Sequence, residues 1–316
     1  MPSGGATLAL LAIPVNSAIL RQLSTGALRL AEMSRASAAP PETTLRTRLK
    51  GLEGDGLVVK RGRDGDPGVA EHALTASGED LLIVIASLEK WLGQMPEGPL
   101  LFDGAAGKAA IKSLSGAWSS MVLQGVAAGP ISLSGLANLL RDVTYPSVER
   151  RLSAMRKAGQ IVAQPNGGSG TPYVVTEWMQ RSVAPLAAAI RWEQTHLPGA
   201  APSMSRGEVD TAFLLALPLL QVEVDMDGSC RMDVKMDDGE KRPAGATAVV
   251  VKGSVISCAL EGKHPSDAWA TGSQPAWATT LISTSTRKLR FGGDQPLARA
   301  LFGDLRLLLF PTPQSS

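Results

Sequence analysis

Basic and hydroxyl-bearing side chains gather on one face of a predicted helix near residue 45. Leu45, Leu49 and Leu52 follow helical spacing and would bury the opposite face. The remaining positions can donate hydrogen bonds to base edges and phosphates: Thr43, Thr44, Arg46, Thr47, Arg48 and Lys50. Arginine can pair with guanine through two hydrogen bonds, and threonine offers a hydroxyl and a methyl group. This pattern predicts a helix that enters the major groove of double-stranded DNA.

A predicted hairpin follows this helix and adds further cations. Residues 57–59 and 72–74 are typical of short strands, and residues 63–66 (Arg-Asp-Gly-Asp) supply the turn. Its basic residues would neutralise backbone phosphates and make binding salt-dependent: Lys60, Arg61 and Arg63. Two short helices are predicted before the reading helix, over residues 16–24 and 28–35, and Arg29 is counted among the DNA contacts. A closing helix over residues 75–91 completes a winged helix-turn-helix.

The first 200 or so residues repeat this pattern. Gly26 and Gly129 are 103 positions apart, as are Leu49 and Leu152, and Thr75 and Thr176 match after a two-residue shortening. The repeat predicts a second winged helix. Its third helix, over residues 145–158, exposes Ser147, Arg150, Arg151, Arg156 and Lys157, with Glu149 opposing them. Its wing, over residues 164–172, has no basic residue. Two interpretations stay open: a structural partner, or a reader that contacts DNA through Ser147, Arg150 and Arg151.

The first repeat resembles the HxlR family of bacterial transcriptional regulators. The residues that carry the resemblance are 19–23, 26–30, 45–52, 56–58, 74–78 and Trp91, and it extends to Gly129, Arg151, Gly159, Thr176 and Trp192. It implies a winged helix, a recognition helix over residues 43–50, and a homodimer on a palindromic site. The family's customary aromatic is replaced by Leu30 and Leu133, and its tyrosine by His72. Two fused copies also suggest that one chain does what the family's dimer does.

The pattern changes after a Pro- and Gly-containing linker at residues 198–202. Alternating apolar residues predict strands over 222–226, 230–236, 248–251 and 255–260, followed by helices over 275–283 and 295–310. We expect an antiparallel meander with one apolar face. The residues 267–277, 289–294 and 297–310 resemble a sterol-carrier-protein-like domain, which implies an apolar cavity. Its wall would include Met226, Met232, Met236, Trp269 and Trp277, although each of these is also an ordinary core residue.

The expected architecture is therefore α+β with three domains: winged helices over 1–97 and 98–198, and a ligand-binding or dimerisation domain over 199–316. The net charge of +2 hides an uneven distribution, with six basic residues between Arg46 and Arg63. A polyanion partner is therefore expected to meet the repeats rather than the balanced C-terminal part. Three scattered histidines predict no metal site or cofactor, and the Gly104–Lys108 stretch lacks the pattern of a phosphate-binding loop. Two cysteines and no long apolar run favour a cytoplasmic protein without a membrane partner.

The leading hypothesis is a bacterial transcription regulator whose tandem winged helices bind operator DNA and whose C-terminal domain binds a hydrophobic effector. No catalytic residue set points to an enzyme. One alternative is a protein of a natural-product cluster that sequesters a small molecule and uses winged helices as a scaffold. Another is a winged-helix DNA-repair enzyme, for which the sequence has no Gln-x-Gln or Gln-x-Asp signature.

Overall fold

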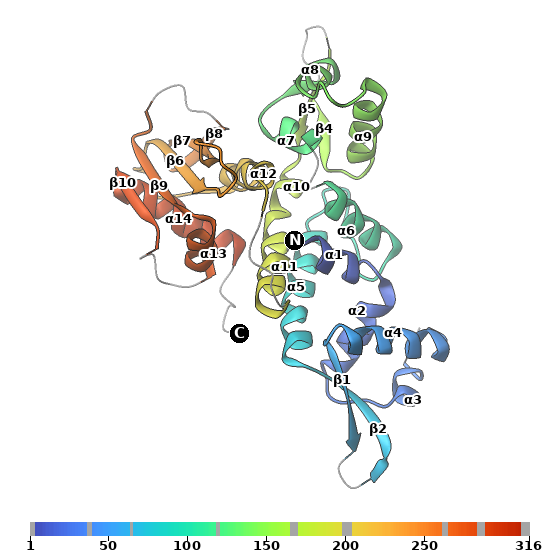
Figure 1. Ribbon diagram of the computed structural model, residues 1–316. Helices are drawn as coiled ribbons and strands as arrows, with labels where there is room; N and C mark the ends of the chain where they lie inside the picture. Colours follow the sequence, from blue (N-terminus) through green and yellow to red (C-terminus); the bar gives the residue numbers. More distant parts are fainter. Residues whose placement is uncertain are drawn as a thin grey trace. The chain divides into compact units, whose positions relative to one another are not determined.

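The computed structural model describes residues 4–36, 40–63, 66–117, 121–164, 170–197, 204–260, 265–282 and 288–310, without the side chains of 63, 66–69, 116 and 117. It is an α+β structure with three sheets in the described part (Figure 1). The chain divides into two compact units. The first comprises Gly4–Lys112 and Ala188–Gly199, and the second comprises Ser113–Ala187 and Ala200–Ser316, together with Met1–Ser3.

The first unit contains the expected winged helix-turn-helix. Its elements are α1 (Gly5–Leu11), α2 (Pro14–Leu23), α3 (Leu30–Met33), α4 (Glu42–Gly54), β1 (Val58–Arg63), β2 (Asp66–Leu74) and α5 (Ala76–Leu92). The helix expected over 28–35 is shorter than predicted. Leu28 instead exchanges backbone hydrogen bonds with His72, at 2.9 and 2.8 Å. This antiparallel bridge joins the segment before α3 to the wing strand β2.

Two later helices, α6 (Ala105–Ala117) and α11 (Val183–His196), contribute to the first unit. The Trp192 indole donates to the Ser77 carbonyl at 2.8 Å. The buried Glu193 carboxylate accepts from the backbone N–H groups of Gly4 and Thr7, both at 3.0 Å, and from the Thr7 hydroxyl at 2.9 Å. Residues of the C-terminal half of α11 thus complete the core of the first unit.

The second unit begins with elements in the same order as those of the first. They are α7 (Met121–Ala127), β3 (Ile131–Ser132), α8 (Leu133–Leu139), α9 (Tyr145–Lys157), β4 (Ile161–Ala163), β5 (Pro172–Val175) and α10 (Glu177–Arg181). Gly56 and Gly159 both adopt positive φ, at 72° and 69°. The hydroxyls of Thr75 and Thr176 both cap a helix and both donate to the carbonyl of that glycine, at 2.7 and 2.8 Å.

The C-terminal part of the second unit is a five-stranded sheet with helices. Its elements are α12 (Arg206–Ala216), the 3-10 turn η1 (Leu217–Leu219), β6 (Gly228–Lys235), β7 (Ala244–Val251), β8 (Ser254–Ala259), β9 (Ala268–Ser273), α13 (Gln274–Ile282), β10 (Arg290–Gly293) and α14 (Gln295–Leu309). The strand order is β10-β9-β6-β7-β8. The inner face packs aromatic rings: the Trp277 centroid lies 5.4 Å from that of Phe213 and 5.8 Å from that of Phe302.

Two sequence expectations for this sheet are wrong. The meander β6-β7-β8 is antiparallel, but β9 pairs with β6 in parallel, so the sheet is mixed. The reason is that the chain after β8 returns to the free side of β6 rather than turning back beside β8. Residues 222–226 do not form a strand, because Val222 bonds to Gly253 and Met226 closes a turn on Glu223.

Candidate nucleic-acid interface

The helix α4 presents the residues of the predicted reading face to solvent. It starts directly after Pro40 and Pro41, which favour extended backbone before a helix. Leu45, Leu49 and Leu52 are buried, as their spacing predicts. The opposite side is exposed at Thr43, Arg46, Thr47, Arg48 and Lys50, whereas Thr44 is half-buried.

Within this face, Thr43, Thr47 and Lys50 share the i, i+4, i+7 spacing that aligns side chains along one stripe. Arg46 and Arg48 lie on either side of the stripe. The Thr47 hydroxyl donates to the Thr43 carbonyl at 2.9 Å, and Arg46 pairs with Glu42 at 2.8 Å. That ion pair is exposed and therefore weak, so Arg46 can exchange Glu42 for a phosphate or a base.

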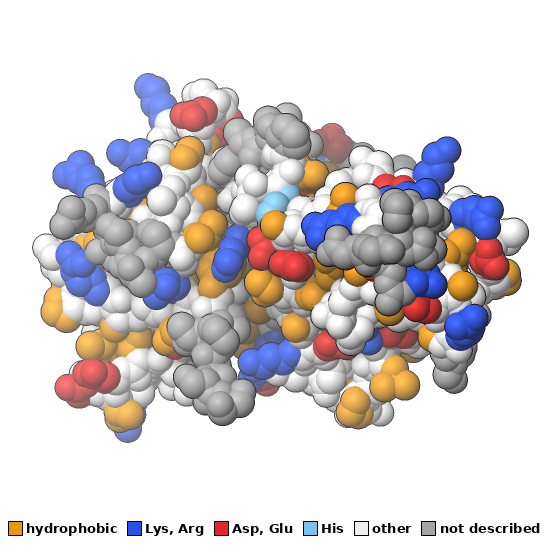
Figure 2. All heavy atoms as spheres, turned by 90° about the horizontal axis from the view of Figure 1, so that it is seen from below, with side chains coloured by type: hydrophobic (Ala, Val, Ile, Leu, Met, Phe, Trp, Pro, Cys, Tyr) orange, Lys and Arg blue, Asp and Glu red, His pale blue; other side chains and the backbone are white. Residues whose placement is uncertain are grey.

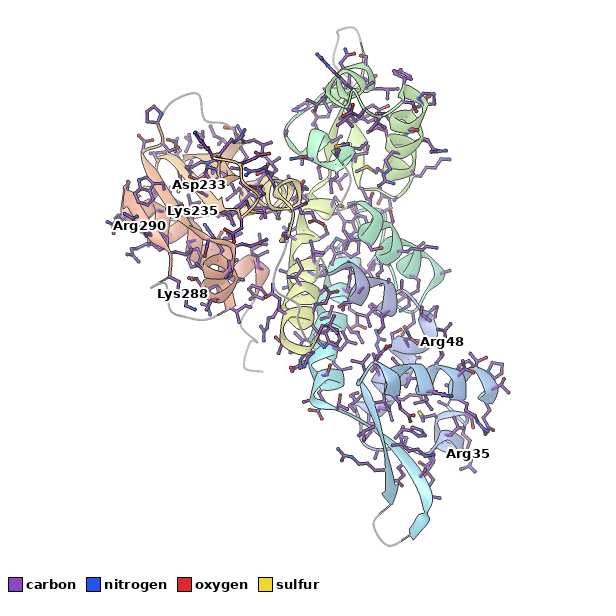
Figure 3. The ribbon with its side chains drawn as sticks, viewed as in Figure 1. Arg35, Arg48, Asp233, Lys235, Lys288 and Arg290 are labelled. Atoms are coloured by element: carbon purple, nitrogen blue, oxygen red, sulfur yellow. The ribbon has the colours of Figure 1, made fainter. Side chains whose placement is uncertain are left out.

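A further cation lies near the reading helix, and sequence reasoning missed it. Arg35 follows α3 and is exposed, as is Arg48 on α4 (Figure 3). In the described part of the chain, none of the ion pairs engages Arg35, Arg48 or Lys50. Their charges are therefore available to a polyanion. The signal in the sequence was a basic residue directly after the first helix of a helix-turn-helix.

Arg29 is less available than its sequence position indicated. Its backbone N–H donates to the Glu32 carboxylate at 2.7 Å, and its guanidinium lies 3.8 Å from the Glu71 carboxylate. The side chain is one-third exposed. Arg29 therefore joins the start of α3 to the wing strand β2.

The wing carries its cations on both faces. In the strand register, Lys60 lies opposite His72 and Arg61 lies opposite Glu71. The side chains of Lys60 and Arg61 therefore point to opposite faces of the ribbon, and both cations are exposed. His72 also contacts Glu53 at the end of α4, with 3.2 Å between Nε2 and Oε1. The wing is thus attached to the reading helix. The side chain of Arg63 lies outside the described residues.

Gly51 is a feature of the reading helix that the sequence interpretation passed over. It lies on the exposed side of α4, and a Cβ built there meets no atom within 4 Å. Glycine inside a helix costs about 1 kcal/mol relative to alanine. No neighbouring atom within the protein requires a glycine at position 51, whereas the close approach of a DNA backbone to this face would require one. The corresponding position of α9 is Ala154.

Helix α9, the expected counterpart of α4 in the second repeat, has a different surface. Arg150 and Arg151 are exposed, whereas Ser147 is half-buried and accepts a hydrogen bond from the Thr144 hydroxyl at 2.9 Å. The buried side is again apolar, with Val148, Leu152 and Met155. In the sequence of the second wing, neither lysine nor arginine occurs from 164 to 172, and residues 165–169 lie outside the described chain.

The structure separates the residues expected to line an apolar pocket. Met232 and Trp277 are buried on the inner face of the sheet, and the Trp277 indole donates to the Asp233 carbonyl at 2.8 Å. Trp269 lies on the outer face, where its ring covers Gly292. Met226 lies in the turn after η1, and Met236 follows β6; both are half-buried.

Other chemistry finds little support among the described residues. No group of three His, Cys, Asp or Glu side chains there could hold a metal ion. Burial raises the pKa of both the Cys230 and the Cys258 thiols to about 12, so neither is a ready nucleophile. No single described helix could cross a membrane; α1 and α2 together have the length and composition, but a bend of 84° separates them.

Surface charge alone does not locate an interface. Lys and Arg side chains are spread over the face seen in Figure 2, with Asp and Glu side chains between them. The geometry of α4 and the wing is more specific, since a polar helix face beside a cationic hairpin is the arrangement of a winged-helix DNA-binding domain.

Comparison with known families agrees with that class. Residues 15–98 match the HxlR-like helix-turn-helix family. The match runs from α2 through α5 and includes α4 and both wing strands. This part of the chain is similar to HxlR-like helix-turn-helix domains, and the similarity suggests a DNA-binding transcription regulator. A search among curated proteins finds no match to the chain.

Proposed function

We propose that the protein is a cytoplasmic transcription regulator that binds operator DNA mainly through its first winged helix. The observation that carries the proposal is the exposed stripe of Thr43, Thr47 and Lys50 between Arg46 and Arg48, on a helix fixed by three buried leucines. Such a stripe suits base edges in the major groove, and Lys60 and Arg61 suit the adjacent phosphates.

The second repeat is proposed as a winged helix with a weaker DNA contact. The shared glycine φ values and threonine caps support a common frame. The DNA contacts proposed for this copy are Ser147, Arg150 and Arg151, of which the two arginines are exposed. The proposed domain limits are 1–97, 98–198 and 199–316, with part of α11 closing the first unit.

The C-terminal domain is proposed to bind a hydrophobic effector in the manner of a sterol-carrier-like fold. Helices α12, α13 and α14 and the inner sheet face supply an apolar interior that includes Phe213, Met232 and Trp277. An effector that prefers one conformation of this domain would shift operator affinity by linkage.

The test is selection of genomic DNA fragments by the purified chain, followed by titration of the selected fragment. Arg48→Ala should weaken specific binding by about 1–3 kcal/mol, because a base or phosphate contact is lost. Lys90→Ala is the matched control, since Lys90 is exposed on α5 away from the reading helix. If no fragment is selected even at low salt, or if both variants bind like the unmodified chain, the proposal is wrong.

A further inference from the structure

The outer face of the C-terminal sheet carries a set of aligned cations. On β6, Cys230, Met232 and Val234 are buried on the inner face. Side chains alternate along a strand, so Arg231, Asp233 and Lys235 belong to the outer face. The charges of this region nearly balance in number, but the strands place them on different faces of the sheet.

The register aligns these residues across three strands. Asp233 of β6 pairs with Thr271 of β9, and Thr271 pairs with Arg290 of β10. Lys235 pairs with Ser273 in the next row. Lys288 lies two residues before Arg290, in the turn that leads into β10. Both side chains are exposed, while the intervening Leu289 is buried.

Three of these cations are uncompensated. Asp233 is paired with Arg231 at 2.6 Å, and Arg231 also donates to the Leu260 carbonyl. Beyond β6, Arg206 binds Asp238 and Glu240, at 3.0 and 3.1 Å, and its hydrogen bond holds the pKa of Asp238 below the ordinary value.

In contrast, the ion pairs of the described residues include none to Lys235, Lys288 or Arg290, and all three side chains are exposed (Figure 3). We call these three residues the cationic strip. Asp237 follows Lys235 by two positions, and its single negative charge leaves the strip with a net positive charge.

The groups beside the strip suit a phosphodiester backbone. The Thr271 hydroxyl lies between the strands that carry the cations. Lys235 and Arg290 lie at the edges of this group of strands, on β6 and β10, with β9 between them. The Trp269 ring lies flat against Gly292, where a Cβ would come 2.1 Å from its Cζ2, and it borders the strip with a half-buried aromatic surface. Lys, Arg and Thr side chains are among the groups that contact DNA phosphates.

We propose that the cationic strip of Lys235, Lys288 and Arg290 is a second DNA-contacting surface, which binds backbone phosphates outside the segment read by α4. The inference rests on the proposed function, because it assumes that the chain binds duplex DNA. It also revises the expectation from charge that only the repeats meet a polyanion. The strip contributes affinity and salt dependence without sequence preference.

The test uses the full chain and compares two triple variants that remove the same charge. One replaces Lys235, Lys288 and Arg290 by alanine. The control replaces Lys90, Lys241 and Arg299, which are also exposed. Affinity for the selected operator in a long flanking duplex is measured over a range of salt concentrations. Each phosphate contact contributes about 0.9 to the slope of log K against log salt, so the strip variant should lose about 2 to 3 in slope.

The strip variant should also lose protection of the flanking DNA in a footprint while keeping protection at the operator. The control variant should keep both the slope and the footprint. Equal slopes and footprints in the two variants would overturn this inference alone. Absence of DNA binding by the unmodified chain would instead overturn the proposed function, and this inference with it.

Discussion

At the scale of single residues, Gly51 in the interior of helix α4 is a glycine that no contact within the protein requires. Gly51 is exposed, and a Cβ there would meet open space. Gly51→Ala should therefore raise the free energy of unfolding by about 1 kcal/mol, because alanine loses less backbone entropy in a helix. The same methyl group would keep the helix from approaching DNA closely, so operator affinity should fall several-fold. Unfolding in urea and a DNA titration measure the two effects.

Gly303 provides the matched control for this prediction. It lies inside α14 and likewise has no atom within 4 Å of a built Cβ. Gly303→Ala should stabilise the protein to a similar degree and leave DNA binding unchanged. A Gly51→Ala protein that binds its operator as tightly as the Gly303→Ala protein would show that close approach is not the reason for this glycine.

At the scale of elements, a buried lysine ties α6 to α1 and α2 in the first unit. The Lys108 ammonium donates to the Leu11 carbonyl at 2.9 Å and to the Ser17 hydroxyl at 2.7 Å. It lies 3.6 Å from Asp103 and 3.8 Å from the centroid of the Phe102 ring. Burial lowers the pKa of Lys108 from 10.5 to about 8, and Asp103 opposes part of that shift.

This pKa predicts a pH dependence of stability. Between about pH 8 and pH 10.5 the unfolded chain binds more protons at Lys108 than the folded chain does. The free energy of unfolding therefore gains a contribution from Lys108 as pH rises through that window, by no more than about 3 kcal/mol. Urea unfolding of the unmodified chain and of Lys108→Met at pH 8 and pH 10 isolates this contribution.

Lys112→Met is the control for the same measurement, because Lys112 lies on the same helix and is exposed. The Lys112 variant should keep the pH dependence of the unmodified chain, whereas the Lys108 variant should lose the part between pH 8 and pH 10. An identical pH dependence in both variants would contradict the lowered pKa.

Elements with a strong local pattern could be predicted from the sequence. The apolar spacing of Leu45, Leu49 and Leu52 located α4, and Thr75 located the start of α5. Helix α12 was missed, although Ser205 and Glu208 form the capping box that its sequence contains. A helix boundary is a local property, so a closer reading could have found it.

Contacts between distant segments could not be predicted in this way. The parallel pairing of β9 with β6 depends on where the chain returns after β8, and alternation of apolar residues does not encode that choice. The position of Trp269 on the opposite face from Met232 follows from that register. Likewise, only the three-dimensional structure brings Glu193 to the first turn of α1. Of the interface, the sequence predicted the α4 residues but not the ion pair that occupies Arg29.

At the scale of the whole molecule, the proposed repeat offers a way for one chain to take the place of a dimer. The C-terminal half of α11, from the second repeat, packs in the first unit through the Trp192 hydrogen bond to Ser77 and through His196, whose Nε2 lies 2.8 Å from the Asp80 carboxylate. Glu193, which is 1% exposed, accepts three hydrogen bonds there. Helix α11 thus packs against α5 within one polypeptide.

We therefore expect one chain per operator complex, rather than the homodimer usual for proteins that resemble its first repeat. The mass of the saturated complex, measured by sedimentation or native mass spectrometry on a single selected operator, gives the stoichiometry directly. The two copies should also contribute unequally to DNA recognition. The first copy has Gly51 and a cationic wing, while the second has Ala154 and a wing without lysine or arginine from 164 to 172. Arg48→Ala should consequently cost more affinity than Arg150→Ala. Two chains on one operator, or equal losses in these two variants, would mean that the copies act as the equal half-site readers of a symmetric assembly.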